Sequence, residues 1–134
     1  MTPHQHFVQY YETDRMGITH HSNYIRWMEE ARVHFLTELG WPYELLEEKG
    51  IISPVTAVSC HYLATSTFAD QIKISVKVAK IKAARFILTY EMFNQKDQLI
   101  CQSQSEHSFL DRKGRFVNLK KILPEFYGKL QELS

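Results

Sequence analysis

The residues with the most capacity for chemistry are concentrated in one stretch near the N-terminus. Residues 9–24 read Gln-Tyr-Tyr-Glu-Thr-Asp-Arg-Met-Gly-Ile-Thr-His-His-Ser-Asn-Tyr. Within it, Asp14 could act as a general base or as a nucleophile, and the imidazole of His21 could order water or assist proton transfer. The chain contains no Ser-His-Asp arrangement, Walker loop or Gly-x-Gly-x-x-Gly motif. We therefore take this segment as the candidate site.

The two histidines fall at the expected start of a long amphipathic helix. Apolar residues recur at i, i+3, i+4 and i+7 from Tyr24 onward, which predicts a helix over 21–39 that ends before Gly40. The charged residues between these positions, including Arg32, are expected to face mostly outward. The first turn of a helix has unpaired backbone N–H groups and the positive end of the dipole. Such a turn could polarise a carbonyl oxygen while a carboxylate across the loop acts on the carbonyl carbon or on water.

Metal binding is the competing use of these histidines, together with His4 and His6. Adjacent helical residues point about 100° apart, and no Glu-x-x-His or His-x-x-x-His spacing accompanies His20 and His21. We therefore predict no metal site.

The elements that must position this segment predict a curved antiparallel sheet around the long helix. A short helix is expected over 43–49, and after Gly50 the hydrophobic period changes from 3.6 to 2. The expected strands cover 7–12, 51–64, 72–79, 84–93, 99–110 and 115–117, and a last helix covers 124–133. Consecutive strands on short turns, including a hairpin turn at 80–83, favour antiparallel pairing. The predicted class is α+β.

One face of the 99–110 strand has only small side chains at Cys101, Ser103 and Ser105. This face could allow the helix to approach the sheet closely, or it could face solvent, and the pattern leaves both open. Cys60 and Cys101 form no Cys-x-x-Cys pair, so we expect two buried, reduced thiols.

Composition limits the class of protein. With 134 residues, 44% of them hydrophobic, the chain is long enough for one well-packed domain spanning 1–134. A net charge of +1 without charged blocks argues against a nucleic-acid partner. No apolar run approaches the roughly 20 residues of a membrane span. The polar residues 1–7 do not resemble a signal peptide, so we expect a cytoplasmic protein.

The order of residues from Tyr10 to Tyr24 resembles a known family. The pattern is Tyr-x-x-x-Asp-x-x-Gly-x-x-x-His-x-x-Tyr, and it is followed by Trp27, Glu29, Ala31 and Arg32. It is similar to the opening motif of the hot-dog-fold acyl-CoA thioesterases, the 4-hydroxybenzoyl-CoA thioesterase-like family. Ile-Leu-Pro at 122–124 also resembles the family's exit from the last strand. The chain departs from the family at Met16, where many relatives have a small residue, and in having Glu-Thr-Asp where relatives have Glu-Asp-Thr-Asp.

The resemblance covers nearly the whole chain and implies a hot-dog fold with thioesterase activity. The implied substrate is an acyl thioester of coenzyme A or of an acyl carrier protein, cleaved without metal or organic cofactor. The implied assembly is a homodimer or homotetramer with its pocket at the subunit boundary. An open edge strand on a small sheet would favour such pairing.

The resemblance also implies roles for individual residues. Asp14 matches the catalytic carboxylate, and His21 matches the position whose backbone N–H would polarise the thioester carbonyl. Tyr10, also assigned to the catalytic group, could hydrogen-bond Asp14 or line the pocket. Gly17 and His20 are assigned to substrate binding, with Gly17 supplying an unusual backbone conformation or a close approach. The basic residues Lys82 and Arg85 could contact the phosphates of coenzyme A.

Each role has a structural alternative. Asp14 could cap a turn, and Tyr10 could belong to the core. His21 could be a polar residue at the helix start that has no role in the reaction. Lys82 and Arg85 could be ordinary surface charges. Two other functions compete with hydrolysis: non-catalytic binding of acyl thioesters, and hydroxyacyl dehydration, for which related hot-dog enzymes carry the acid on the helix.

Overall fold

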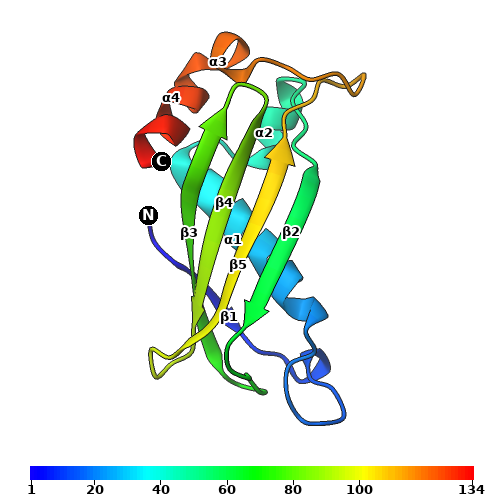
Figure 1. Ribbon diagram of the computed structural model, residues 1–134, viewed down its shortest axis with the longest axis vertical. Coiled ribbons are helices and arrows are strands. Elements are labelled where there is room, and N and C mark those ends of the chain that lie inside the picture. Colours follow the sequence, from blue (N-terminus) through cyan, green and yellow to red (C-terminus); the bar gives the residue numbers. More distant parts are fainter.

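The computed structural model describes residues 1–134 as one antiparallel sheet with helices on one side and at one end (Figure 1). The strands are β1 (His4–Phe7), β2 (Val55–Tyr62), β3 (Gln71–Lys82), β4 (Arg85–Phe93) and β5 (Leu99–Ser108). The helices are α1 (Ser22–Leu39), α2 (Tyr43–Glu48), α3 (Leu119–Ile122) and α4 (Pro124–Leu133), and a 3-10 turn, η1, covers Tyr10–Glu12.

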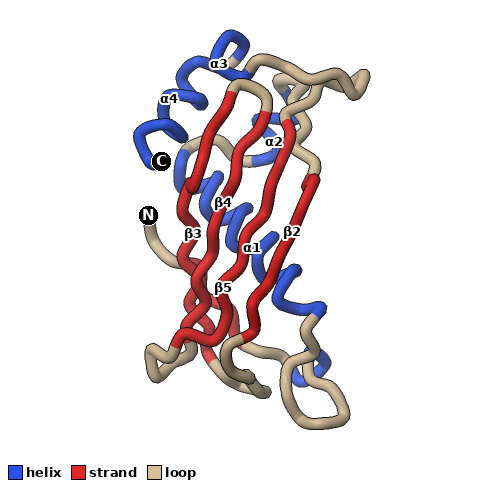
Figure 2. The backbone as a smooth tube through the Cα atoms, in the orientation of Figure 1, coloured by secondary structure: helices blue, strands red, loops and turns tan.

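The strand order in the sheet is β1-β3-β4-β5-β2, and every neighbouring pair is antiparallel. Figure 2 shows α1 running obliquely behind the strands, so that the sheet curves around it. The predicted α+β class and the curved sheet around a long helix are confirmed. None of the helices combines the length and apolar character needed to cross a membrane.

Helix α1 holds the core together because its apolar stripe packs on the inner face of the sheet. The stripe is fully or nearly fully buried, and it consists of Tyr24, Trp27, Met28, Ala31, Phe35 and Leu36. The small side chains of β5 also point inward, since Cys101, Ser103 and Ser105 are all buried. Of the two possibilities left open for this face, exposure to solvent is thus excluded. Both cysteines are free thiols, with Cys101 buried and Cys60 half-buried.

Two expectations about the ends of the chain are wrong. The first strand stops at Phe7 instead of continuing to residue 12, because the chain turns there into the 3-10 turn η1. The Glu12 N–H donates a hydrogen bond to the Gln9 carbonyl (3.0 Å), and the Gln9 N–H donates one to Glu12 Oε1 (2.8 Å). Residues 115–117 form no strand but only an isolated bridge between Leu110 and Phe116.

Other boundaries shift by a few residues. The hairpin turn is shorter than expected, since β3 continues to Lys82, where it pairs with Arg85. Helix α3 was not predicted; it is four residues long, and the Asn118 side chain accepts a hydrogen bond from the Lys121 N–H.

Arg32 is the clearest exception to the expected pattern of α1. Its side chain was expected to face outward, but only 7% of the residue is exposed. The guanidinium turns under the sheet, where Nη1 donates a hydrogen bond to the Tyr90 hydroxyl (3.1 Å). The partner that explains this burial lies far along the chain, on β4.

Candidate functional site

The loop between η1 and α1 is closed at its base and orients Asp14. Thr13 and Thr19 form an isolated antiparallel bridge, and the Asp14 N–H donates to the Ile18 carbonyl (2.8 Å). Asp14 Oδ1 accepts the Met16 N–H (2.8 Å), which leaves Oδ2 without a hydrogen bond from the protein. The carboxylate is therefore held in one orientation, half-buried, with one oxygen free to act on another molecule.

Gly17 makes this tight loop possible. Its φ is +81°, a left-handed conformation that side chains with a Cβ rarely adopt, and its N–H donates to the Asp14 carbonyl (3.0 Å). A Cβ at this position would meet nothing within 4 Å. The unusual backbone conformation predicted for Gly17 is therefore present, and the space that a side chain would fill is open.

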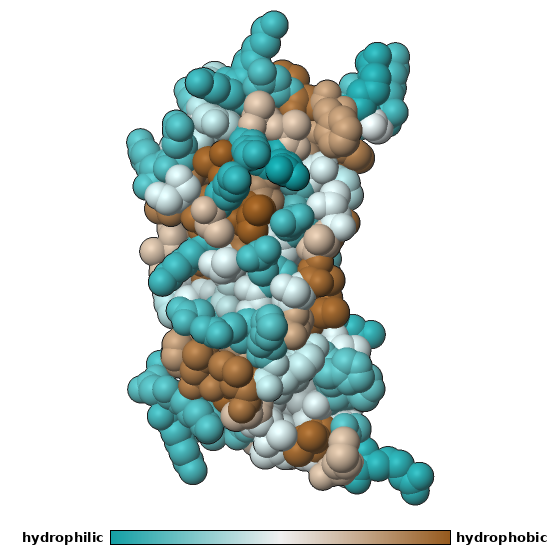
Figure 3. Space-filling view, in the orientation of Figure 1, coloured by the Kyte–Doolittle hydropathy of each residue, from teal (hydrophilic) through white to brown (hydrophobic).

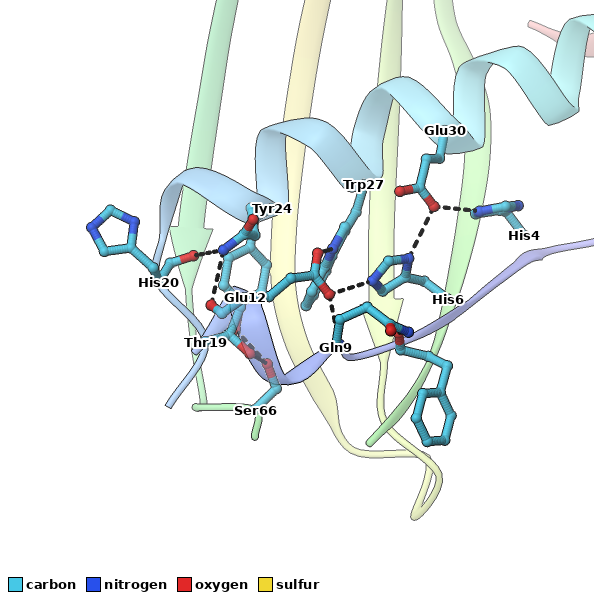
Figure 4. Close-up of polar contacts among 12 residues, drawn as sticks. His4, His6, Gln9, Glu12, Thr19, His20, Tyr24, Trp27, Glu30 and Ser66 are labelled. Carbon is cyan, nitrogen blue, oxygen red and sulfur yellow. Dashed lines mark hydrogen bonds and ion pairs between the residues drawn. The ribbon is translucent and has the colours of Figure 1, made fainter. Parts of the chain in front are cut away.

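Glu12 connects this loop to its surroundings (Figure 4). Its buried carboxylate accepts hydrogen bonds from His6 Nε2 (2.8 Å), from the Gln9 N–H (2.8 Å) and from Trp27 Nε1 (2.7 Å). Burial would raise the pKa of Glu12, but the hydrogen bonds from Gln9, His6 and Trp27 together hold that pKa below its ordinary value. The Glu12 backbone carbonyl accepts from the His20 N–H (2.8 Å) and from Asn23 Nδ2 (2.9 Å).

The start of α1 has an available backbone donor. His20 Nδ1 accepts the Ser22 N–H (3.2 Å), and the Asn23 N–H donates to the His20 carbonyl (3.0 Å). The N–H of His21, directly before the helix, has no hydrogen-bond partner in the chain. Because it lies at the positive end of α1, this donor is suited to an oxygen that gains negative charge.

A pocket of about 330 Å³ lies beside this donor. His21 and Tyr24 of the helix start form one wall, and Tyr62 and Leu63 from the end of β2 form another. The Ser66 hydroxyl holds the walls in place through hydrogen bonds to Thr19 Oγ1 (2.6 Å) and to the Tyr24 hydroxyl (2.9 Å). Most of the lining is apolar, as is typical of a site that binds an acyl group.

The structure brings some of the predicted site residues together and separates others. His21 lines the pocket, and Ile18, whose carbonyl binds the Asp14 N–H, also lines it. Asp14 does not line the pocket, and its connection to the pocket wall is the backbone hydrogen bond to Ile18. His20 is exposed and its imidazole contacts Ser22, at the outer side of the helix start.

Tyr10 has neither of the contacts expected of it. It is 76% exposed, so it does not belong to the core, and its hydroxyl makes no hydrogen bond to Asp14. Its ring packs edge-on against Phe68 at a centroid distance of 5.6 Å, and its carbonyl accepts the Thr13 hydroxyl (2.7 Å). The local 3-10 turn is the reason, because it turns the ring away from the loop.

Lys82 and Arg85 lie at the opposite end of the sheet from the candidate loop (Figure 1). The loop adjoins the beginning of β3, since Thr67 Oγ1 donates to the Gly17 carbonyl (2.8 Å), whereas Lys82 ends that strand. The length of β3 corresponds to about 35 Å. Within one chain these residues therefore do not reach the pocket, and a role in binding phosphates would need the site of another subunit.

Glu12 and Asn23 lie within the predicted segment but were given no role in it, and Ser66 was not predicted as part of this region. The spacing of Gln9 and Glu12 fits a capping box and could have indicated the role of Glu12. Ser66 and Tyr62 reach the site from a loop and a strand more than 40 residues further along the chain, and no local pattern identifies them. No group of three or more His, Cys, Asp or Glu side chains is arranged to hold a metal ion.

Comparisons with known proteins identify relatives of this chain. Residues 8–130 match the family model of the thioesterase-like superfamily. The chain is 27% identical over 121 residues to YneP of Bacillus subtilis, a putative acyl-CoA thioesterase, and the match covers 90% of this chain and 88% of that protein. It is 31% identical over 118 residues to a putative esterase of Aquifex aeolicus, covering 88% and 91%. The crystal structure of a DHNA-CoA thioesterase from Staphylococcus aureus superimposes with a TM-score of 0.93 at 29% identity, covering 98% of this chain and 89% of that one.

Proposed function

The chain belongs to the thioesterase-like superfamily, and we propose that it hydrolyses an acyl thioester of coenzyme A or of an acyl carrier protein to a free acid and a thiol. The single observation that carries this proposal is the unpartnered His21 N–H at the wall of an apolar pocket, next to the loop that orients Asp14. The names of the relatives as acyl-CoA thioesterases support the same reaction class.

In the proposed reaction the acyl group lies in the pocket and the thioester carbonyl oxygen accepts the His21 N–H. Asp14 Oδ2 removes a proton from a water molecule that attacks the carbonyl carbon, or it attacks that carbon itself and forms an anhydride that water then opens. In both routes the C–S bond breaks, the thiolate of coenzyme A leaves and takes up a proton, and the acid is released. The backbone donor stabilises the oxyanion, a contribution of about 3–4 kcal/mol for donors of this kind.

Each of the two competing functions would require a different arrangement of residues at the site. A dehydratase of this fold would need a carboxylate of α1 that faces the pocket, but Glu29, Glu30 and Glu38 of α1 are all exposed on its outer side. A non-catalytic binder would need the pocket but not the oriented carboxylate. The orientation of Asp14 therefore favours hydrolysis over both.

Replacing Asp14 by Asn tests the proposal. We expect Asp14→Asn to lower kcat by about 100-fold or more on an acyl-CoA panel, because a general base or nucleophile is lost, while the melting temperature stays within about 2 °C of the wild type. Asp97→Asn is the matched control, since Asp97 lies in an exposed turn where it pairs only with Lys73 (2.7 Å); it should leave kcat unchanged.

Undiminished hydrolysis by Asp14→Asn would refute the assignment. A wild-type protein that binds acyl thioesters without cleaving them would support the non-catalytic binder.

A further inference from the structure

Every buried side-chain nitrogen or oxygen that has no hydrogen-bond partner belongs to one region beneath the sheet. The four atoms are Arg32 Nε, Ser53 Oγ, Ser103 Oγ and His107 Nδ1. Buried polar atoms in folded proteins are nearly always paired, so each exception needs an explanation. Four exceptions in one place indicate a common cause.

A chain of hydrogen bonds connects these residues. The Arg32 guanidinium donates to the Tyr90 hydroxyl, which hydrogen-bonds Ser105 Oγ, and Ser105 Oγ hydrogen-bonds His107 Nε2 (2.8 Å). Ser103 lies opposite Tyr90 in the register of β4 and β5, on the same inward face as Ser105. The backbone of Ser53 lies beside the His107 ring. We call this group the Arg32 cluster.

The Arg32 cluster carries one positive charge without a carboxylate partner. Arg32 forms no ion pair, although only 7% of it is exposed. Burial and the nearby Arg32 charge lower the pKa of His107 to about 4, so His107 is neutral at pH 7. A buried cation without a counter-charge is unfavourable. The cluster is therefore suited to a group that accepts hydrogen bonds, and best to one with negative charge.

A row of side chains leads from the candidate pocket to this cluster. Tyr24, Met28 and Arg32 follow one another at four-residue spacing on α1; Tyr24 and Met28 contact β2, and Arg32 contacts Tyr90 of β4. The Tyr24 ring lies 5.1 Å from that of Tyr62 in the pocket, and Met28 Sδ lies 3.7 Å from Cys60 Sγ. Eight residues of helix correspond to about 12 Å. An acyl chain that starts at the pocket and follows this row would end at Arg32.

Within a single chain, this row is open along β2. Because β2 is an edge strand, its inward-facing Val58 and Tyr62 remain 43% and 47% exposed, and Cys60 is only half-buried. In the register of β2 and β5, Cys60 lies opposite Ser103 and Val58 opposite Ser105. On the inward face of β5, the residues next to this edge therefore have only small hydroxyl side chains.

We propose that the Arg32 cluster binds an oxygen at the far end of the acyl group, so that preferred substrates carry a hydroxyl or carboxylate at the end of a medium-length acyl chain. Arg32 Nε and the Ser103 hydroxyl would donate hydrogen bonds to that oxygen. This proposal rests on the proposed function and narrows its substrate class.

Acyl-CoA substrates whose acyl chains have equal length but different ends test the proposal. We expect wild-type kcat/KM to be at least about 10-fold higher for 10-hydroxydecanoyl-CoA or decanedioyl-CoA than for decanoyl-CoA, since a buried site rejects a ligand that leaves its polar groups unpaired. A preference for only one of the two identifies the oxygen as hydroxyl or carboxylate. Ser103→Ala and Arg32→Met should bring this ratio toward one. Ser75→Ala, on the outward face of β3, is the control and should keep the wild-type ratio. A wild-type ratio of one or less would overturn the proposal.

Binding of non-hydrolysable analogues separates this proposal from the proposed function. The S-decyl, S-(10-hydroxydecyl) and S-(9-carboxynonyl) thioethers of coenzyme A can be titrated by calorimetry. We expect a Kd at least about 10-fold lower for a polar-ended thioether, and loss of this difference in Ser103→Ala, a small change in volume that the fold should tolerate. Failure to cleave any thioester would refute hydrolysis, whereas equal Kd values for all three thioethers would refute the polar subsite.

Discussion

Glu12 is the side chain on which the geometry of the candidate site most depends. Its carboxylate joins β1 through His6 to α1 through Trp27, and its backbone carbonyl holds His20 and Asn23 at the helix start. The loop that starts with Asp14 begins two residues after Glu12 and ends at His20, which the Glu12 carbonyl holds. We therefore infer that Glu12 is a positioning residue, which acts through Asp14 and His21 without touching the substrate.

Glu12→Gln should destabilise the protein by about 1–3 kcal/mol at pH 7, because an amide cannot accept all three hydrogen bonds and leaves a buried donor unpaired. Since folding lowers the pKa of Glu12, its carboxylate stabilises the fold above its ordinary pKa of 4.5, and this contribution is lost as pH falls through the lowered value. The difference in free energy of unfolding between wild type and Glu12→Gln should thus shrink below about pH 4.5. Urea unfolding at pH 7 and at pH 3.5 measures both effects.

Glu30→Gln is the control for this prediction. Glu30 also accepts hydrogen bonds from His6 (2.9 Å) and His4 (3.0 Å), but its side chain is 43% exposed. An exposed pair contributes little, so the expected loss is below about 1 kcal/mol. A positioning role further requires that Glu12→Gln lower kcat more than it raises KM; equal stability of the two variants at pH 7 would contradict the role given to Glu12.

At the scale of elements, the loop between η1 and α1 depends on a single backbone conformation. Gly17→Ala should cost about 1 kcal/mol of stability, because alanine is strained at φ +81°. It should also lower hydrolysis, since the Gly17 N–H holds the Asp14 carbonyl. Gly114→Ala is the matched control: Gly114 has a φ of +78° and equally open surroundings, but lies in a distant turn. Unfolding and kcat should show similar stability losses for both variants and reduced activity only for Gly17→Ala. Equal activity in the two would show that the loop conformation is not needed for the reaction.

The elements that the sequence predicts well are those defined by a long local period. Helix α1 and the β3–β4 hairpin follow from regular spacing of apolar residues, and the candidate site falls within the continuous segment 9–24. Structural features that depend on contacts with residues far along the chain cannot be predicted from such local patterns. The burial of Arg32 depends on Tyr90, 58 residues away, and the pocket wall depends on Ser66, 42 residues from Tyr24. Lys82 and Arg85 were placed near the site because the sequence does not show which end of a strand adjoins the loop before α1.

At the scale of the whole molecule, β2 is left unpaired on one side. Its eight residues are exposed except for the half-buried Cys60, and its free backbone groups form a long edge of the sheet. Hydrophobic side chains lie along this edge of the molecule (Figure 3), among them Val55 and Val58. A long edge strand with apolar side chains favours pairing with another chain, and a two-fold copy is the simplest partner. The pocket ends beside Tyr62 of the same strand, so pairing at β2 would place the pocket at a subunit boundary.

We therefore expect a homodimer, or a tetramer of two such dimers, that charge on β2 disrupts. Val58→Lys should shift the mass measured by analytical ultracentrifugation toward the 15.8 kDa monomer, because a lysine in a dry interface must be desolvated without a partner. Val33→Lys is the control: Val33 is 44% exposed on the outer side of α1 and Val58 is 43% exposed, so the two substitutions add the same charge at equal exposure. Because the measurement is of mass, a contact of Val58 with the acyl group could not imitate the result. If the wild type sediments as a monomer, or if both variants keep its mass, then β2 is not the interface and the pocket must function within one chain.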